Sequence, residues 1–386
     1  MHFEPSEEQL AFADTARAFA REEFAPFAAQ WDAEAHFPRE TLAKAGELGF
    51  CGLYAPERIG GLALPRLDAT FVFEELAAID PSTTAFLTIH NMATWMLGTW
   101  GTDAVRAEWG QALSSGQKLA SYCLTEPGAG SDAASLKTRA ERVGDEYIIH
   151  GNKAFISGAG STDVLVLMAR TGAAGADGIS AFVVPAHAQG ISYGKKEQKM
   201  GWNSQPTRTI NFDQVRIPAH NLLGSEGEGF RIAMKGLDGG RINIATCSVG
   251  AAQGALAQAQ RHMQEREQFG RPIAGFQALQ FKLADMATEL VAARQMVRLA
   301  ASKLDRQDPT ATTYCAMAKR FATDAGFAVC NEALQLHGGY GYIRDYPLER
   351  LLRDARVHQI LEGTNEIMRV IIARRMLQDD APDAIR

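Results

Sequence analysis

The chain has little cysteine, and no arrangement of it that indicates a metal site or a disulfide framework. Its five cysteines are dispersed among 386 residues without a C-x-x-C pair. This pattern argues against a disulfide scaffold and a zinc centre, so a reducing compartment and no metal are predicted. Free cysteine is usually buried, and each is interpreted as a small core residue in preference to a nucleophile. The five are Cys51, Cys123, Cys247, Cys315 and Cys330.

Long apolar runs and a surplus of positive charge are also missing. No stretch of about 18 apolar residues exists, and the first nine residues are acidic, without the basic start or apolar stretch of an export signal. We therefore expect no membrane insertion and a cytoplasmic location, or the mitochondrial matrix if a transit peptide was removed. With 39 basic and 45 acidic residues, the net charge of −6 makes nucleic acid an unexpected partner.

A dinucleotide fingerprint is absent as well. No G-x-G-x-x-G follows a predicted strand, so a Rossmann domain is not supported. What the sequence does contain is 46% hydrophobic and 22% charged residues, which is typical of a globular chain. Its length is sufficient for two or three domains that each bury a core.

Three residue patterns follow one another along the chain, helical, β-rich and helical again, and they predict an α+β protein that is mainly helical. Residues 1–118 are helical in pattern, with a capping box at Ser6 and Gln9 and a further cap predicted at Ser82. Residues 119–223 contain short β-rich runs, and the sequence His150-Gly151-Asn152 predicts a hairpin turn.

Residues 224–386 return to a helical pattern. One long helix is predicted between residues 276 and 308, which contain neither glycine nor proline. Within it, apolar residues recur at alternating spacings of three and four, the pattern of a bundle helix whose stripe faces a core. These residues are Leu283, Met286, Leu290, Ala293 and Val297.

Glu362 is the candidate catalytic residue. Apolar Ile360 and Leu361 precede it, Gly363 lets the backbone pass close to a ligand, and a helix is predicted to begin at Thr364. A poorly solvated carboxylate has a raised proton affinity, which suits it to remove a proton from carbon near neutral pH. The other interpretation is a loop glutamate that caps the following helix.

A second candidate segment runs from Tyr122 to Asp132 and contains two glycines, one proline and several small polar groups. Exposed amides and hydroxyls in such a turn can bind a flat heterocycle with several acceptors, or phosphate oxygens. An ordinary Gly-Pro turn is the alternative.

With these two segments in this order, the sequence resembles the acyl-CoA dehydrogenase family over essentially its whole length. The resemblance implies an N-terminal α-helical domain (1–118), a middle β-barrel domain (119–223), a C-terminal four-helix bundle domain (224–386) and a homotetramer. Four further segments carry it: 155–160 (FISGAG), 201–208 (GWNSQPTR), 239–245 (GGRINIA) and 335–341 (QLHGGYG).

The resemblance implies that FAD is the cofactor and assigns two sets of contacts. The first set would contact the isoalloxazine and the nearby part of FAD: Tyr122, Cys123, Leu124, Thr125, Gly130, Ser131, Phe155, Ile156, Ser157, Thr364, Asn365 and Glu366. The second would contact the adenosine diphosphate part of FAD in a neighbouring subunit: Arg266, Phe276, Gln277, Gln335, Leu336, His337, Gly338 and Gly339.

Some of these residues have simpler explanations. Phe155 could be a core residue of the β domain. Arg266 could be a solvated helix charge. Glu366 could be placed by the dipole of its helix.

The resemblance also assigns the substrate site. Ser131, Asp238, Gly239, Gly240, Arg241 and Arg374 would contact the acyl-CoA thioester. In members specific for isovaleryl-CoA the base precedes the matching arginine, where this chain has Gly240, so Glu362 is the one candidate. Short branched isobutyryl-CoA, oxidised to methacrylyl-CoA in valine catabolism, is the implied substrate, and electron-transfer flavoprotein the implied acceptor.

The implied chemistry is loss of the α-proton to Glu362 and of the β-hydride to flavin N5, since no side chain accepts a hydride. The amide of Glu362 and a ribityl hydroxyl would stabilise the enolate oxygen. Alternative substrates are 2-methylbutyryl-CoA and butyryl-CoA, because one methylene changes selectivity by only about 10- to 200-fold. Alternative functions are a flavin acyl-CoA oxidase and a non-catalytic paralogue that binds CoA or flavin.

Overall fold

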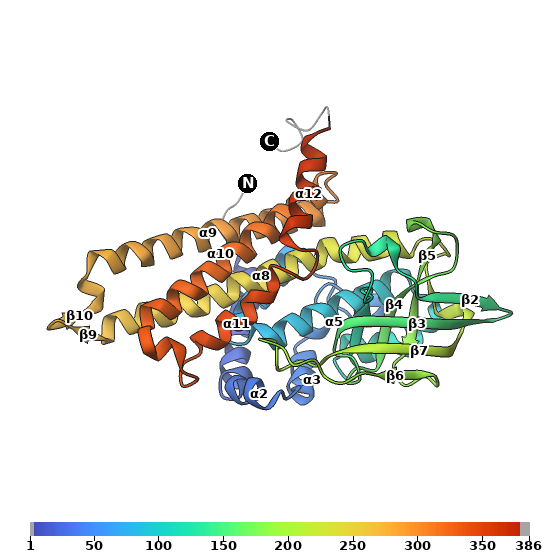
Figure 1. The fold of residues 1–386 in the computed structure, drawn as a ribbon, viewed down its shortest axis with the longest axis horizontal. Helices are drawn as coiled ribbons and strands as arrows, with labels where there is room; N and C mark the ends of the chain where they lie inside the picture. The colour runs from blue at the N-terminus through green and yellow to red at the C-terminus, as the bar shows by residue number, and fades with distance from the viewer. Residues whose placement is uncertain (1–3, 379–386) are drawn as a thin grey trace.

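The computed structural model describes residues 4–378. Residues 1–3 and 379–386 lie outside the described part, and with them the first residues used to predict location and the ends of the first and third predicted domains. The molecule is elongated: long helices α8, α9 and α10 form one half, and a β-sheet forms the other (Figure 1). No helix among residues 4–378 has the length and apolar character needed to cross a bilayer.

The N-terminal part is helical, and its first helix begins as predicted. The Ser6 hydroxyl accepts a hydrogen bond from the Gln9 amide, and the Gln9 side chain accepts one from the Ser6 amide. The helices are α1 (Glu7–Phe19), α2 (Ala28–Glu34), α3 (Arg39–Glu47), α4 (Arg66–Ala77), α5 (Pro81–Trp100), α6 (Asp103–Val105) and α7 (Gln111–Ser114), with short turns η1 (Ala20–Phe24), η2 (Phe50–Gly52), η3 (Glu57–Ile59) and η4 (Arg106–Gly110).

The predicted cap at Ser82 is wrong. Helix α5 begins at Pro81, and Asp80 is its N-cap. Proline is favoured at the first helical position because the amide it lacks has no partner there, and its fixed φ suits a helix. Ser82 therefore lies inside the helix, where its hydroxyl accepts a hydrogen bond of 2.6 Å from Ser204.

The middle part is an eight-stranded sheet in the order β6-β7-β3-β2-β4-β5-β8, with β1 added parallel to β4. Buried apolar residues fill β4 and β5 almost completely, because helices cover this part of the sheet. The strands are β1 (Ala120–Cys123), β2 (Arg139–Val143), β3 (Glu146–Ser157), β4 (Val164–Arg170), β5 (Ile179–Pro185), β6 (Ile191–Tyr193), β7 (Thr207–Pro218) and β8 (Leu222–Leu223), with η5 (Ala133–Ser135), η6 (Ala176–Gly178) and η7 (Ala219–Asn221) between them.

The predicted hairpin turn at residues 150–152 is wrong as well. Strand β3 runs straight through this sequence, and its pairing with β7 shifts register between Ile149 and Gly151. Gly151 has φ of 140°, and a Cβ on it would lie 2.6 Å from the Thr138 Cα. The glycine thus marks a bulge where two backbones approach closely.

The C-terminal part is helical again, and the predicted long helix is confirmed as α9 (Gln277–Asp305). It packs with α8 (Gly229–Glu265) and α10 (Ala311–His337). The remaining elements are β9 (Glu267–Gln268), β10 (Arg271–Pro272), η8 (Ile273–Gly275), η9 (Gly338–Tyr342), α11 (Leu348–His358) and α12 (Asn365–Met376).

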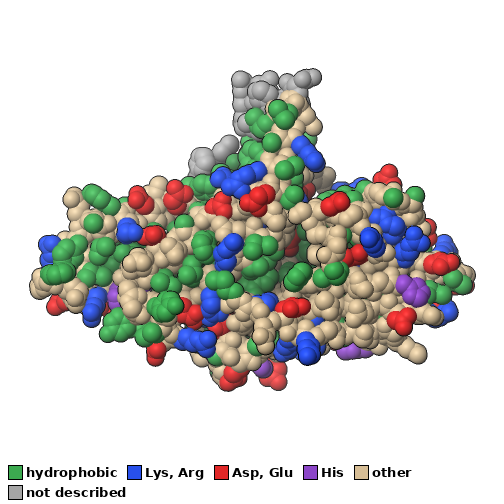
Figure 2. All heavy atoms as spheres, viewed as in Figure 1, with side chains coloured by type: hydrophobic (Ala, Val, Ile, Leu, Met, Phe, Trp, Pro, Cys, Tyr) green, Lys and Arg blue, Asp and Glu red, His purple; other side chains and the backbone are tan. Residues whose placement is uncertain are grey.

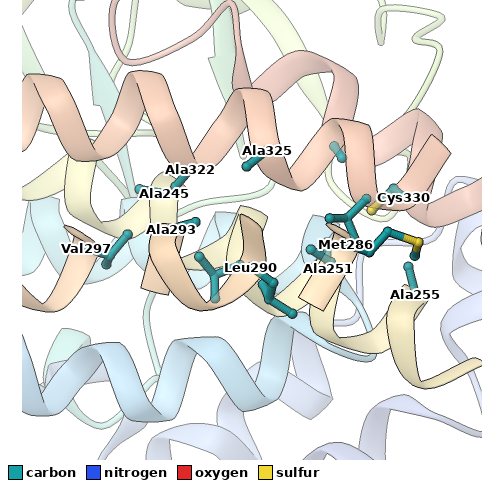
Figure 3. Packing of buried hydrophobic residues seen from close by; sticks show 14 of the residues in the cluster. Ala245, Ala251, Ala255, Met286, Leu290, Ala293, Val297, Ala322, Ala325 and Cys330 are labelled. Carbon is teal, nitrogen blue, oxygen red and sulfur yellow. The ribbon is translucent and has the colours of Figure 1, made fainter. Parts of the chain in front are cut away.

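The predicted core stripe of α9 is confirmed. Met286, Leu290, Ala293 and Val297 are buried, and Leu283 packs against the same cluster. Figure 3 shows the four buried side chains of α9 between alanines of α8 and α10. Small residues let the helices approach closely, so that the larger side chains of α9 fill the space between them. All five cysteines are buried and free, as predicted.

Hydrophobic side chains remain exposed on the half formed by the long helices (Figure 2). Phe269, between β9 and β10, is 93% exposed, and Tyr342 after α10 is 82% exposed. Apolar exposure of this extent is a mark of an interaction surface.

Candidate active site

The loop between α11 and α12 carries Glu362 in an unusual backbone conformation. Glu362 has φ of 56° and Gly363 has φ of 87°, so two successive residues are left-handed. Glycine adopts this region freely, but glutamate does so at a cost of roughly 1–2 kcal/mol. Helix α12 then begins as predicted, because the Thr364 hydroxyl accepts a hydrogen bond from the Ile367 amide. The cap is Thr364, which removes the alternative of a capping role for Glu362.

The carboxyl of Glu362 is poorly solvated. The residue is half-buried, but its Oε2 is buried and has no hydrogen-bond partner within residues 4–378. Burial raises the pKa of Glu362 to about 7, against the opposing effect of the positive charges on Arg241 and Lys319. A carboxyl with this pKa is ionised in a large fraction of molecules at neutral pH and is basic enough to take a proton from carbon.

Helix α8 brings a second predicted segment to this carboxyl. A Cβ placed on Gly240 would lie 2.4 Å from Oε2 of Glu362, so the two residues are in direct contact. Next to it, Arg241 is 5% exposed and forms an ion pair of 2.7 Å with Asp238. The Arg241 Nε has no partner in the described part of the chain. Asp238 in turn accepts a hydrogen bond from Thr312.

The glycine-rich segment lies between β1 and β2, and a buried ion pair holds it. Lys153 is 0% exposed and donates to the Leu124 carbonyl and the Glu126 carboxylate, at 2.9 and 2.8 Å. Glu126 also accepts from the amides of Lys137 and Thr138. A second contact joins the segment to β3, because the Thr125 carbonyl accepts from the Ala154 amide. The segment is thus fixed on the side that faces β3.

Other parts of the same segment, around Gly128 and Gly130, have open space beside them. Nothing lies within 4 Å of a Cβ placed on Gly128 or Gly130, and Ser131 is exposed. The Tyr122 hydroxyl is buried without a partner among residues 4–378, and burial, followed by the charge of Glu362, raises the pKa of this phenol well above its usual range. The structure therefore brings Tyr122 into the electrostatic field of Glu362, 240 residues further along the chain. Cys123 points the other way, into the core of the sheet.

Phe155 is not a core residue. It is 70% exposed and has φ of 55°, at a second register shift between β3 and β7. Its neighbour Ile156 is buried, and the Ser157 carbonyl accepts a hydrogen bond from Ser121. A large aromatic ring held outward by a strained backbone is the arrangement expected where a ligand or partner covers it.

The predicted adenosine-diphosphate contacts meet in a separate pocket of about 580 Å³. Arg266 and residues 335–339 line it together with His262 and Tyr340. The His262 and His337 rings stack at 4.2 Å, and the Arg266 guanidinium lies 5.5 Å from the Tyr340 ring centroid. Phe276 is half-buried beside the pocket residue Leu279 in the same cluster, whereas Gln277 is exposed.

This pocket is far from the sheet. Figure 1 places β9 and β10 at one end of the molecule and β2 at the opposite end. The chain therefore does not bring Arg266 and Tyr122 into one site. Arg374 also stands apart, exposed on α12, which projects from the body of the molecule.

Asn365 and Glu366 differ from each other. Glu366 is exposed, and hydrogen bonds with its own amide and with Thr364 lower its pKa, as expected at a helix start. Asn365 is buried against α10, where its side chain contacts Lys319, Thr323 and Asp324. Lys319 was not singled out from the sequence. The available signal was a lysine directly after the apolar run Ala316-Met317-Ala318 of a predicted helix.

Comparison with known proteins identifies the class. The N-terminal, middle and C-terminal domains of acyl-CoA dehydrogenases match residues 6–117, 121–215 and 227–377. The chain belongs to the acyl-CoA dehydrogenase family, an enzyme family of flavoprotein oxidoreductases that act on CH-CH donors, and the predicted fold class is confirmed. The domain boundaries given above stay a prediction.

Within the family, the chain is similar to the mitochondrial isobutyryl-CoA dehydrogenase of Dictyostelium discoideum, with 53% identity over 97% of this chain and 90% of that protein. Butyryl-CoA dehydrogenase from Megasphaera elsdenii has a similar structure, with a TM-score of 0.95 and 38% identity over 98% of this chain and 100% of the other. A chain in the structure of the electron transferring flavoprotein of Acidaminococcus fermentans is also similar, with a TM-score of 0.95 and 41% identity over 98% of this chain and 100% of the other.

Proposed function

We propose that the protein oxidises isobutyryl-CoA to methacrylyl-CoA with FAD as cofactor, and that Glu362 removes the α-proton. The observation that carries this proposal is the buried, unpartnered Oε2 of Glu362, with a pKa raised to about 7. The similarity to an isobutyryl-CoA dehydrogenase supports the choice of substrate and a role in valine catabolism.

The residues present fit a flavin. The open side of the loop at Gly128 and Gly130, the outward Phe155 ring and the unpartnered Tyr122 hydroxyl together offer a surface of amides, an aromatic face and a polar donor. These are the groups that a flat heterocycle with several acceptors requires. Tyr122–Thr125, Gly130, Ser131 and Phe155–Ser157 would hold the ring system, with Thr364–Glu366 near it.

In the proposed reaction, Glu362 accepts the proton from the α-carbon of the thioester. The negative charge that develops on the thioester oxygen is stabilised by the amide of Glu362, and the nearby guanidinium of Arg241 contributes positive potential. When FAD is bound, it supplies the acceptor for the β-hydride. Burial of the carboxyl keeps water away from the proton that is transferred.

Arg241 and Asp238 are proposed to bind the thioester beside the base, with Gly239, Gly240 and Ser131. Arg374, exposed on α12, is proposed to contact the substrate away from the base. The ion pair with Asp238 fixes the guanidinium, while its Nε has no partner within the described residues and is available for a carbonyl oxygen. The contact between Gly240 and Glu362 then places the substrate-binding part of α8 next to the base.

We also propose a homotetramer in which a neighbouring subunit completes the cofactor site. The pocket at Arg266 and residues 335–339 lies at the end of the molecule that carries β9 and β10, whereas Tyr122 and Phe155 belong to strands of the sheet. We therefore assign the two sets of FAD contacts to different subunits. Exposed Phe269 and Tyr342 near this pocket supply apolar surface for the neighbour. Electron-transfer flavoprotein is the proposed acceptor, in keeping with the similarity to a chain in an electron transferring flavoprotein structure.

Stopped-flow absorbance of the FAD-loaded protein tests the substrate. The protein is mixed anaerobically with isobutyryl-CoA and, separately, with butyryl-, 2-methylbutyryl- and isovaleryl-CoA. Fastest loss of the oxidised-flavin band with isobutyryl-CoA is expected. If the band is lost faster with another thioester, that thioester replaces isobutyryl-CoA as the assigned substrate. If the band is lost with none of them, the proposed function is contradicted. Rapid peroxide formation in air without a protein acceptor would favour an oxidase.

A further inference from the structure

Lys319 is a buried charge that the reaction described above does not use. It lies on α10, is 0% exposed, and its Nζ donates to the Gly363 carbonyl at 2.7 Å and to the Asn365 side-chain oxygen at 2.8 Å. Burying an ammonium group costs several kcal/mol unless it is paired. Gly363 belongs to the loop that carries Glu362, and Asn365 is the first residue of α12 directly after it, so Lys319 joins the core of the bundle to this loop and its end.

The second acceptor is itself held in place. The Asn365 amide group donates to the Thr323 hydroxyl at 2.9 Å and to Asp324 at 2.7 Å. Asp324 also accepts from the Gln359 side chain, on the other side of the loop, at 2.8 Å. Side chains of α10 therefore bind both ends of the segment from Gln359 to Asn365. Among these hydrogen bonds, the one from Lys319 reaches Gly363, the residue next to Glu362.

The backbone at Glu362 needs such support. Left-handed φ at a non-glycine residue is costly and persists only where the surroundings over-determine it. The hydrogen bond from Lys319 fixes the orientation of the peptide between Gly363 and Thr364, one residue beyond the strained Glu362. Without it, the loop loses its contact with α10 closest to the carboxylate.

We propose that Lys319 is a positioning residue for Glu362, which holds the carboxylate in place through the Gly363 carbonyl and keeps it ionised through its positive charge. This inference rests on the proposed function, because only there is Glu362 the base. Lys319 does not contact the substrate in this account. It acts through Glu362.

The charges around the two residues define the expected effect. Glu362 is influenced by Arg241 from α8, Lys319 from α10, Tyr122 from β1 and Tyr54 from the segment after η2. Of these, the two cations favour the carboxylate. When Lys319 is removed, Arg241 is the only one of these two cations that still stabilises the carboxylate. The pKa of Glu362 is therefore expected to rise.

The acidic groups around Lys319 favour its charge, while burial opposes it. Burial lowers the pKa of Lys319 to about 8, while the charges of Glu362, Asp324 and Glu366 oppose this shift and Arg241 adds to it. The ammonium is thus mostly protonated at pH 7 and supplies the charge that the proposal requires.

The test compares Lys319→Met, which removes the charge, with Lys319→Arg, which keeps it. Arg369→Met is the matched control, because Arg369 is half exposed on α12 and also lies near Asp324, at 3.6 Å. In each FAD-loaded protein, the protonation of Glu362 is followed by infrared titration of the carboxylic acid band that Glu362→Gln lacks. The pH profile of flavin reduction by isobutyryl-CoA is measured in parallel.

In Lys319→Met, both midpoints are expected to rise by on the order of one pH unit, the size of effect that a nearby opposite charge has on a carboxyl. Lys319→Arg is expected to keep the midpoint and to reduce flavin more slowly, because a guanidinium does not fit the same hydrogen bonds. Arg369→Met should match the parent protein.

An unchanged infrared midpoint in folded Lys319→Met, or an equal rise in Lys319→Arg, would overturn the proposal. If Lys319→Met does not fold, Lys319→Gln removes the charge while retaining a donor and is judged by the same criterion. Failure of the proposed function is a separate result: the parent protein would not be reduced by any thioester, while the infrared midpoints would still report on Lys319.

Discussion

Gly240 and Glu362, 122 residues apart in sequence, are so close that a Cβ on Gly240 would lie 2.4 Å from the carboxylate oxygen Oε2. Real Cβ atoms do not approach an oxygen this closely, so the glycine leaves the space in which the carboxylate lies. The absence of a side chain at position 240 is thus a requirement of the site. Helix α8 and the loop before α12 form the site only together.

This contact predicts the effect of Gly240→Ala. The added methyl group must displace the carboxylate, and a shift of about 1 Å in a reacting group can lower a rate by about 10²-fold. The measurement is the rate of flavin reduction by isobutyryl-CoA.

Gly236→Ala is the matched control for this substitution. It lies one turn earlier on the same helix, and the atoms nearest to its added Cβ belong to methionine side chains, with the closest at 3.1 Å. These side chains can adjust, and alanine favours a helix by up to about 1 kcal/mol over glycine. Its rate should remain that of the parent protein, and equal losses in both variants would contradict the assigned role of the Gly240 contact.

The raised pKa of Glu362 predicts how stability depends on pH. In the unfolded chain this carboxyl ionises near its ordinary pKa of 4.5, and in the folded protein near 7. Between these values the folded state binds more protons, so the free energy of unfolding falls as pH rises through this window. Relative to the parent, Glu362→Gln should therefore gain on the order of 1–3 kcal/mol between pH 4.5 and 8. Thermal unfolding of both proteins at pH 4.5 and pH 8 measures this gain. A difference in the free energy of unfolding between variant and parent that is the same at both pH values would contradict the prediction.

The buried ion pair between Lys153 and Glu126, which holds the glycine-rich segment, predicts that Lys153→Met loses FAD if this segment binds it as proposed. Removing Lys153 leaves Glu126 without its buried counter-charge, which typically costs about 3–5 kcal/mol. The loop from Leu124 to Ser131 should then lose its fixed position, with lower flavin content per subunit as the measured result. Lys137→Ala is the control, since the Lys137 side chain is exposed and only its amide binds Glu126. Full flavin content in Lys153→Met would contradict this prediction.

The exposed ring of Phe269 predicts a link between assembly and cofactor binding. Phe269→Ser should weaken the contact between subunits, and FAD should then dissociate as the protein is diluted, because binding that depends on a partner follows mass action. Light scattering and flavin absorbance on a dilution series measure both. Val143→Ser, which changes an apolar residue 48% exposed at the opposite end, should alter neither. Dilution-independent FAD binding in Phe269→Ser would contradict the shared site.

Much of the fold and part of the site follow from local patterns. The cap at Ser6, the extent of α9 and its core stripe depend on residues within a few turns of each other, and they were predicted. The wrong predictions at Ser82 and at residues 150–152 came from local signals that a neighbour overrides: Pro81 begins the helix two residues earlier than a cap at Ser82 implies, and Thr138 requires the glycine at position 151.

The remaining features of the site depend on contacts across the chain. The likeness of the Glu362 loop to a known motif indicated the base, but not the approach of Gly240 or the hydrogen bond from Lys319 to Gly363. These contacts arise because α8 and α10 pack against each other and meet the same loop. A pattern within one segment contains no information about the distance to another.

The rate of flavin reduction in Glu362→Gln tests the central claim most directly. Glutamine keeps the size of the side chain but cannot accept the α-proton, and a positioned general base contributes about 10²- to 10⁴-fold. FAD content and binding of isobutyryl-CoA should be unchanged, while reduction, followed anaerobically by stopped flow, should slow by at least this factor. Reduction at a rate near that of the parent protein would show that Glu362 is not the base.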